Sequence, residues 1–382
     1  MIYMKNCVNN NTKKILYIAV SSQTGGVPKH ILNALNYAKE NGYEVTVAVP
    51  NDGDYYTWFQ ETGAKMINLQ LKPYSFSSLW KLNNLVRKEK FQIIHSHGKG
   101  AGMYTRPLKV WNPHIKVVHT FHGIYVEAYN LLFRRIYCTI EHILKYWTDV
   151  FVCVSESERQ ESLRLKFVIP SKVRVICNGV DPRVFQNVKA DRALYLDEWG
   201  ISKDAFVVGC VARLEKMKGH LCLIRAFKKV QDKYPQSRLL LVGDGPDRAI
   251  VEQEVKNLGL DNQVIFTGFR HDIPQVLDVC DVFVSASLKE GMPYTLIEAQ
   301  AAGVPVVATN VIGNRDVVLD QETGLLVQAE DSEEMAKGII RMIEEREYAL
   351  ELAKKGQKRV EEFFTIDHVT EQLFDIYKGL MK

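Results

Sequence analysis

Short apolar runs rich in Val and Ile recur along the chain, and helical patterns fill the intervals between them. The first run, Lys14–Val20, precedes the segment Val27–Glu40, in which Ile31, Leu35 and Ala38 fall on one face. Such runs are typical of strands buried on both faces of a parallel sheet, and the second spacing is typical of an amphipathic helix. Because the two patterns alternate, the chain is predicted to form doubly wound parallel sheets of the α/β class.

The predicted strands fall into two groups, separated by a turn cluster at Asn178–Pro182 and a polar stretch at Gln186–Asp191. Two domains are therefore expected, over residues 1–190 and 191–365, followed by an amphipathic helix over Ile366–Met381. The other strands expected in the first domain are Val45–Val49, Met66–Leu69, Phe91–His97, Val117–Thr120, Val150–Ser155 and Val173–Ile176. Those expected in the second are Phe206–Ala212, Leu239–Gly243, Val264–Phe266, Val282–Ala286, Val304–Ala308 and Leu325–Val327.

One strand–loop–helix–strand unit, Asp281–Thr309, carries the clearest functional signal. Pro293 suits the start of a helix over Tyr294–Ala302, and Gly303 suits its left-handed end. In such a unit the loop and the helix N-terminus lie at the carboxyl edge of the sheet, where open α/β sheets bind ligands. Backbone N–H groups and the positive helix end favour an anion there, such as a diphosphate.

Two carboxylates, Glu290 and Glu298, flank this predicted anion site. Because like charges repel, their expected partners are the hydroxyl groups of a sugar or a ribose rather than a phosphate. The alternative is a surface helix with two solvated glutamates. A cationic pair, Arg213 and Lys218, follows the strand Phe206–Ala212, where it could clamp a diphosphate or could simply be solvated.

Composition narrows the class of protein. With 46% hydrophobic and 25% charged residues the chain resembles a globular protein, and no apolar run approaches the ~20 residues of a transmembrane helix. Met1–Thr12 is polar, lacks a signal-peptide core and is given no role. Seven cysteines, an odd number without metal-like spacing, favour a reduced, cytosolic compartment, with Cys153, Cys210 and Cys280 as core residues.

The net charge of +4 conceals an asymmetry between the two halves. Residues 1–190 hold 25 Lys+Arg against 13 Asp+Glu, a net of +12, and the remaining residues hold 24 against 32, a net of −8. Either the two solvated surfaces attract each other, or the first half alone meets an anionic partner. Nucleic acid is disfavoured as that partner, because no recognition module accompanies the basic surplus.

Glu290 in EGM and Glu298 in IEA, with seven residues between them, resemble the signature of glycosyltransferase family 4. This family comprises retaining nucleotide-sugar transferases of the GT-B fold, in which two Rossmann-like domains face each other across a cleft. The resemblance covers nearly the whole chain, through GGV, HTFHG, SESE, NGVD, the R-x4-K-G motif, LVGDGP and FTGF. Met292-Pro293 departs from the aromatic and glycine that many members have, which leaves the donor sugar open.

The resemblance implies roles for individual residues. Arg213 and Lys218 would bind the donor diphosphate, Glu290 would orient sugar hydroxyls, and Glu298 would hold the ribose. His122, and also His97, would lie near the sugar 6-hydroxyl. The other substrate-binding residues expected are Gly25, Gly26, Asn178, Gly243, Gly268, Phe269, Arg270, Gly291, Met292, Pro293, Tyr294, Thr295 and Leu296, several of them through backbone groups.

The resemblance also implies transfer with retention at the anomeric carbon, by a route in which the departing phosphate takes the acceptor proton. No D-x-D motif stands in a suitable loop, so neither a metal ion nor another cofactor is expected beside the UDP-sugar donor. A GT-B epimerase, or a protein that binds a nucleotide-sugar without turnover, would share these motifs. Product analysis with donor alone separates the epimerase, and the four intact site residues disfavour the binding protein.

Two segments suggest the acceptor. Met103–Lys116 and Ala128–Trp147 mix cations with aromatic and aliphatic residues, a composition that suits the surface of an anionic bilayer. A buried helix with solvated ends would have the same composition. Similar bacterial enzymes build capsule, exopolysaccharide or O-antigen units on polyprenyl diphosphate. A peripheral enzyme at the cytosolic membrane face, acting on a lipid-linked or other saccharide acceptor, is therefore expected.

Overall fold

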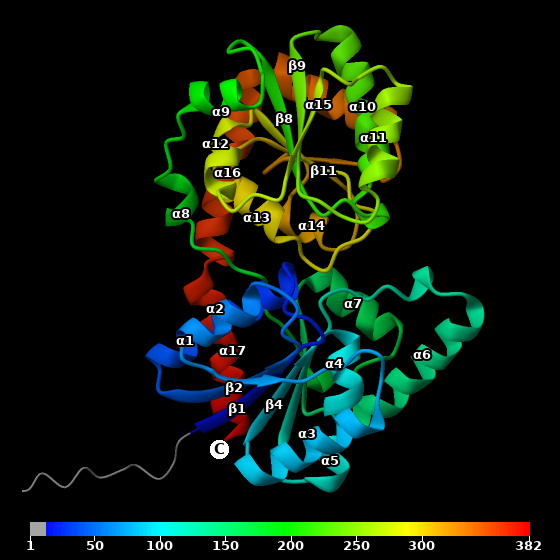
Figure 1. Cartoon of the computed structure of the whole chain (residues 1–382), viewed down its shortest axis with the longest axis vertical. Coiled ribbons are helices and arrows are strands. Elements are labelled where there is room, and N and C mark those ends of the chain that lie inside the picture. Colours follow the sequence, from blue (N-terminus) through cyan, green and yellow to red (C-terminus); the bar gives the residue numbers. More distant parts are fainter. Residues whose placement is uncertain (1–12) are drawn as a thin grey trace, which may run out of the picture. The chain divides into compact units, whose positions relative to one another are not determined.

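The computed structural model describes residues 13–382, which form two compact units (Figure 1). Unit 1 contains the described residues up to Val154, then Arg159–Ile176 and Thr370–Lys382. Unit 2 contains Ser155–Glu158 and Cys177–Val369. The N-terminal stretch to which the sequence assigned no role lies outside the described residues.

Unit 1 is built on a seven-stranded parallel sheet with the order β3-β2-β1-β4-β5-β6-β7. Its central strands are buried on both faces, which explains their unbroken apolar runs. The strands are β1 (Lys13–Ile18), β2 (Tyr43–Val49), β3 (Lys65–Asn68), β4 (Ile93–His97), β5 (Lys116–Thr120), β6 (Val150–Cys153) and β7 (Val173–Val175). All seven predicted strands are confirmed, with small differences at their ends.

Helices connect these strands. The α-helices of the first half are α1 (Gly26–Glu40), α2 (Tyr55–Glu61), α3 (Phe76–Glu89), α4 (Gly98–Thr105), α5 (Leu108–Trp111), α6 (Leu131–Leu144) and α7 (Glu156–Arg164). Single 3-10 turns occur at η1 (Val126–Ala128), η2 (Lys145–Trp147) and η3 (Pro170–Lys172).

Unit 2 repeats the architecture with a six-stranded parallel sheet of order β10-β9-β8-β11-β12-β13. The strands are β8 (Phe206–Val211), β9 (Ser237–Val242), β10 (Val264–Gly268), β11 (Val282–Ser285), β12 (Val306–Thr309) and β13 (Leu325–Val327). The helices of the second half of the chain are α8 (Arg183–Gln186), α9 (Arg192–Glu198), η4 (Lys216–Lys218), α10 (His220–Lys233), α11 (Arg248–Asn257), α12 (Ile273–Val279), α13 (Tyr294–Ala301), α14 (Asn314–Val317), α15 (Ser332–Glu344), α16 (Arg346–Phe363) and α17 (Ile366–Leu380). The predicted fold class, two Rossmann-like parallel-sheet domains, is confirmed.

The boundary between the units falls earlier than the sequence placed it, because residues 177–190 belong to unit 2. Val180 pairs with Thr365, and the backbone of Gly179 lies so close to α17 that a Cβ there would be 2.6 Å from Cγ2 of Val369. These contacts with the segment between α16 and α17 therefore place residues 177–190 in unit 2, although the turn residues in the sequence suggested a later boundary.

The last helix, α17, begins in unit 2 and ends in unit 1. Its Tyr377 is fully buried, with its hydroxyl 3.0 Å from that of Tyr17 on β1 and 2.5 Å from Nδ1 of His95 on β4. Phe374 packs against Tyr37 and Tyr43. Figure 1 shows α17, in red, running beside the first strands of unit 1. The helix is thus part of the core of the unit formed by the other end of the chain.

Helix α4 was not predicted, because its sequence GKGAGMYT contains three glycines, which are poor helix formers. A Cβ on Gly100 would lie 2.8 Å from Cγ1 of Val20, and one on Gly102 would lie 2.6 Å from Cε1 of His119. Gly98 has a φ of 76°. Close packing on the sheet therefore requires small residues and outweighs helix propensity.

A buried ion pair joins α6 to α4. The guanidinium of Arg106 donates to both carboxylate oxygens of Glu141, at 2.6 and 2.8 Å, and its Nε donates to the carbonyl oxygen of Gly102. Both charged side chains are 0% exposed. Glu141 and Leu144 are the buried residues of α6. Among the described residues, the Arg106–Glu141 pair is therefore the main polar contact that attaches α6 to the rest of unit 1.

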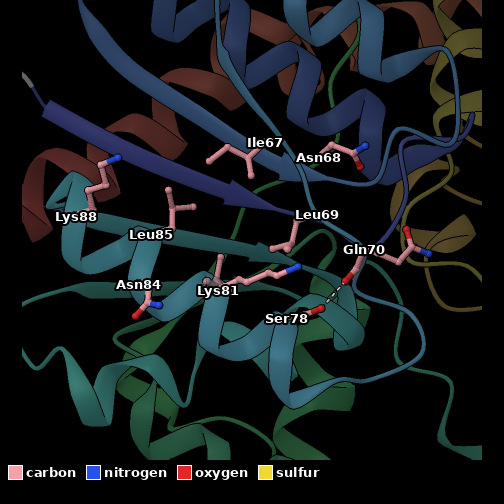
Figure 2. A pocket seen from close by; sticks show the side chains of 10 residues that line it. Ile67, Asn68, Leu69, Gln70, Ser78, Lys81, Asn84, Leu85 and Lys88 are labelled. Atoms are coloured by element: carbon pink, nitrogen blue, oxygen red, sulfur yellow. Dashed lines mark hydrogen bonds between the residues drawn. The ribbon is translucent and has the colours of Figure 1, made fainter.

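Among residues 13–382 no helix combines the length and the apolar character that a membrane span requires. Unit 1 also carries a groove of about 580 Å³ between β3 and α3, lined by Leu69, Leu85, Lys81 and Lys88 among others. Figure 2 shows these side chains and the hydrogen bond from Ser78 to the carbonyl oxygen of Gln70. None of the residues predicted to bind substrate lines this groove.

Candidate functional site

A tight turn at the carboxyl end of β8 brings Lys218 to the end of β11. Gly219 follows η4 with a φ of 68°, in the left-handed region. A Cβ at this position would lie 1.9 Å from the carbonyl oxygen of Ala286, so only glycine allows the turn to sit this close. The amide of Leu288 donates to the carbonyl oxygen of Met217 at 2.8 Å and holds the two segments together.

Lys218 and Glu290, two residues predicted to act on substrate, are in direct contact. Nζ of Lys218 lies 2.6 Å from Oε1 of Glu290, and the hydroxyl of Ser287 donates to the same oxygen at 2.6 Å. The Glu290 side chain is 10% exposed and that of Lys218 is 24% exposed. A cation and a carboxylate are therefore fixed side by side with a small exposed area.

The loop that carries Glu290 is fixed from the opposite side by a second glycine. Gly313 has a φ of 86°, and a Cβ there would lie 2.7 Å from the carbonyl oxygen of Gly291. The amide of Glu290 donates to the carbonyl oxygen of Ile312 at 3.3 Å, and the hydroxyl of Thr309 donates to the carbonyl oxygen of Ser287 at 2.5 Å. These contacts fix the backbone on both sides of the carboxylate.

Helix α13 begins directly after this loop, as the sequence predicted, and Gly303 ends it with a φ of 72°. Pro293 is its N-cap residue and no side chain caps its amides. The N–H groups at the first helical positions, Tyr294, Thr295 and Leu296, therefore have no intrahelical acceptor. The side chain of Leu296 is fully buried, so only its backbone could contact a ligand.

Glu298 lies one turn further along α13 and is 5% exposed. This depth contradicts the alternative of a solvated surface glutamate, because Asp and Glu are rarely buried without a partner. Asn178 is also buried, but its contacts differ from the expectation of direct substrate binding. Its side-chain amide donates to the carbonyl oxygen of Met292 at 2.7 Å, and its backbone amide approaches the Met292 sulfur. Asn178 therefore positions the loop before α13.

Arg213, the other member of the predicted cationic pair, follows β8 and is more exposed than Lys218. The Arg213 side chain is 57% exposed, and the carboxylate of Glu215 lies 3.9 Å from its Nε. Gly243 has a φ of 130°, and a Cβ there would lie 2.3 Å from the carbonyl oxygen of Ala212. Its amide donates to the carbonyl oxygen of Gly268 at 2.8 Å, which joins the ends of β9 and β10.

Phe269 and Arg270 follow β10 and differ in their surroundings. The Phe269 side chain is 49% exposed. The guanidinium of Arg270 contacts the carboxylates of Asp272 and Glu198, each at 2.6 Å. The Arg270 hydrogen bonds lower the pKa of Asp272 to about 2, so that group stays ionised. The Arg270 side chain is thus occupied by protein partners, which leaves its backbone and the Phe269 ring to contact a ligand.

In unit 1 three histidines from different elements converge. His97 ends β4, His122 follows β5, and His30 lies on α1. Nδ1 of His97 lies 3.0 Å from Nε2 of His122, and the His30 ring lies 5.4 and 5.0 Å from the other two rings, centre to centre. The sequence predicted His97 and His122 but not His30, whose only local signal was its place in the first turns of the helix after GGV.

Burial sets the charge of this histidine cluster. Desolvation, with a smaller contribution from the neighbouring histidines, holds the pKa of His97 and of His122 well below the usual value of 6.5. Both imidazoles are therefore neutral at physiological pH. His122 has a φ of 59°, a left-handed conformation that is uncommon outside glycine and is concentrated at functional positions.

Two adjacent glycines between a strand and a helix predict a tight turn, but the Gly25–Gly26 segment does not form one at Gly25. Gly25 is extended, with φ 169° and ψ 173°, and a Cβ there would meet no atom closer than 4.0 Å. The protein's own packing therefore does not require glycine at Gly25. Open space beside the N-terminus of α1 remains compatible with a ligand that approaches the backbone closely.

Two family matches cover most of the chain. Residues 24–184 match Glycosyltransferase Family 4, and residues 191–359 match Glycosyl transferases group 1. The chain belongs to glycosyltransferase family 4. Its two Rossmann-like units are accordingly those of a GT-B enzyme, and its activity is the transfer of a sugar in glycan biosynthesis.

Individual relatives agree with this assignment. The chain is 26% identical, over 95% of its length and 96% of the relative's, to the UDP-Gal:alpha-D-GlcNAc-diphosphoundecaprenol alpha-1,3-galactosyltransferase of Escherichia coli. It is 26% identical, over 91% of its length and 93% of the relative's, to the capsular polysaccharide biosynthesis glycosyltransferase CapM of Staphylococcus aureus. The solved structure of Anabaena HepE with UDP and glucose superposes with a TM-score of 0.86 at 22% identity, covering 96% of this chain and 100% of that one.

Proposed function

We propose that this glycosyltransferase moves a sugar from a UDP-sugar to a saccharide carried on a polyprenyl diphosphate, with retention at the anomeric carbon. The observation that carries the proposal is the buried Lys218–Glu290–Ser287 contact, placed beside the N-terminus of α13. The name of the Escherichia coli relative contains both a UDP-sugar and a lipid diphosphate, and a structural neighbour holds UDP. No metal ion or other cofactor takes part in the proposed transfer.

The proposed roles follow from charge. When the bond between the sugar and the diphosphate breaks, negative charge builds on the leaving oxygen. Lys218 and the first amides of α13 would stabilise this charge, and Arg213, on its exposed side chain, would close over the phosphates. Glu290 would accept hydrogen bonds from sugar hydroxyls and Glu298 from the ribose. The backbone of Gly268, Phe269 and Arg270 would border the base.

In unit 1, His122 would donate a hydrogen bond to the transferred sugar, with His97 holding the His122 ring through the 3.0 Å contact. The departing phosphate would take the acceptor proton, so that no histidine would have to act as the base. Backbone at Gly25 and Gly26 would lie close to the substrates.

The test is turnover with defined substrates. Purified enzyme is incubated with UDP- and GDP-sugars, first in a thermal-shift screen and then with polyprenyl-diphosphate-linked N-acetylglucosamine as acceptor. We expect one UDP-sugar to raise the melting temperature progressively, with the logarithm of its concentration above Kd, and to be consumed only when acceptor is present. Product with the same anomeric configuration as the donor supports retention. Conversion of donor without acceptor would instead identify an epimerase.

The position of the acceptor in a bilayer is supported by α6. Most of its apolar side chains are exposed: Leu131 76%, Leu132 65%, Phe133 61%, Ile136 47% and Ile143 51%. Arg134 and Arg135 lie on the same helix. A helix that presents apolar and cationic side chains outward matches the surface of an anionic membrane, where the lipid-linked acceptor resides. We propose that unit 1 docks there through α6.

Flotation with liposomes tests this docking. We expect the protein to float with vesicles that contain phosphatidylglycerol, and Arg134→Glu/Arg135→Glu to reduce the bound fraction roughly tenfold or more, because cations near the surface supply much of the attraction. The matched control is Lys354→Glu/Lys358→Glu, the same change of charge at two exposed positions of α16. Equal binding by both variants would contradict docking through α6.

A further inference from the structure

Three imidazole side chains in unit 1 have the spacing of a metal site. His30, His97 and His122 each offer a ring nitrogen, and these nitrogens all lie within 4.8 Å of one another. They come from three separate elements, α1, the end of β4 and the residue after β5. His30 is 6% and His97 1% exposed, and His122 is partly buried.

The distances fit a small divalent ion. Zn²⁺ bound by histidine has Zn–N distances of about 2.0–2.1 Å, so nitrogens in a tetrahedral site lie about 3.3 Å apart. Nδ1 of His97 and Nε2 of His122 lie 3.0 Å apart, a hydrogen-bond distance, so a bound ion would replace the hydrogen bond between these two rings. The ligand atoms of the three rings lie within 4.8 Å of one another, so the more distant ring nitrogens must move closer together when they bind the ion. Three histidines with a fourth position open are also a common arrangement for zinc.

A second observation points to a missing ligand. Nε2 of His97 is buried and has no hydrogen-bond partner among the described residues. Buried polar atoms are nearly always paired in proteins, and an unpaired one is a place to look for an ion or a water molecule. The rings of His95 and His97 lie 4.1 Å apart, centre to centre, and His95 is itself fixed by Thr120 and Tyr377. The His97 ring is therefore held in a rigid surrounding.

We propose that His30, His97 and His122 bind one Zn²⁺ or a similar first-row divalent ion. The site lies in unit 1, whereas Lys218, Glu290 and α13 lie in unit 2. Binding uses the lone pair of a His122 nitrogen. If His122 contacts the sugar as proposed above, a bound ion fixes its tautomer and leaves only the other ring nitrogen for that contact.

The first experiment measures the metal alone. The full chain is stripped with a chelator and titrated with Zn²⁺ against a chromophoric competitor. We expect one high-affinity equivalent, weakened by at least about 100-fold in His122→Asn and in His30→Gln, because even changes behind the ligands cost about 10–100-fold. Asparagine suits the left-handed backbone at residue 122, so this variant keeps the loop conformation. His114→Gln, at an exposed position, is the matched control and should bind as the parent does.

Co²⁺ distinguishes this site from the free cysteines of the chain. Three imidazoles and water in a tetrahedral site give a visible absorption band without the near-ultraviolet thiolate band. Absence of binding, or binding that survives both histidine substitutions, would overturn the assignment. Circular dichroism of the stripped variants checks that they fold. If the metal binds as expected and transfer is absent under all conditions, the proposed function fails while the metal site stands.

Discussion

Replacing Lys218 with methionine should lower kcat by about 100- to 1,000-fold, with donor binding reduced much less. Removing one group that stabilises developing charge in other enzymes has an effect of this size. Lys218 is suited to this role because its ammonium is held 2.6 Å from Glu290 and the turn at Gly219 cannot relax away from β11. Steady-state kinetics over a range of UDP-sugar concentrations measures the effect.

The matched control for this experiment is Lys216→Met. Lys216 lies two residues away in the same turn, is exposed, and should keep activity within about twofold of the parent. Glu290→Gln separates a catalytic role from a structural one, since glutamine can keep the hydrogen bond from Ser287 while losing the charge. A lower melting temperature of Lys218→Met with an unchanged kcat would show that the Lys218–Glu290 pair only supports the loop.

Glu141→Ala should destabilise unit 1 by about 3–5 kcal/mol, the range found when one partner of a buried ion pair is removed. The reason is that Arg106, 0% exposed, would keep its charge in an apolar surrounding with only the carbonyl oxygen of Gly102 as acceptor. Urea unfolding and hydrogen–deuterium exchange of peptides from α4 and α6 measure the change. Exchange should rise in these two helices before it rises elsewhere.

Two controls accompany this prediction. Glu351→Ala removes an exposed partner of Lys355 in unit 2 and should leave the melting temperature unchanged, because pairs at the surface contribute little. The double variant Arg106→Met/Glu141→Leu should recover much of the lost stability, since apolar replacement of both partners avoids the unpaired charge. A single variant as stable as the parent would show that water reaches Arg106.

Much of the fold could be predicted from the sequence because its signals are local. Helix α13 was expected over Tyr294–Ala302 and is observed over Tyr294–Ala301, since Pro293 and Gly303 act on their own backbone. The strands were found for a similar reason: burial on both faces leaves unbroken apolar runs. Helix α4 was missed because its glycines reflect contacts with Val20 and His119, which lie far away in the sequence.

The residues of the candidate site also fall into two groups, those that the sequence predicts from local motifs and those whose role depends on tertiary contacts. Lys218 and Glu290 were predicted from motifs, and the structure brings them together because β8 and β11 are neighbours in the sheet. Ser287, Gly313 and His30 carry no motif, and their importance depends on which strands are adjacent. Asn178 was predicted to bind substrate, and its contact with Met292 could not be identified without the tertiary structure.

Helix α17 imposes an order on the folding of the molecule. Its buried residues Leu373, Phe374 and Tyr377 complete the core of the unit whose strands are translated first. Until α17 has emerged from the ribosome, that unit lacks these side chains, and the surface of Tyr17, Tyr37 and Tyr43 that they cover stays incomplete. Although domains commonly fold in the order in which they emerge, the first unit here cannot reach its final packing until α17 has been translated.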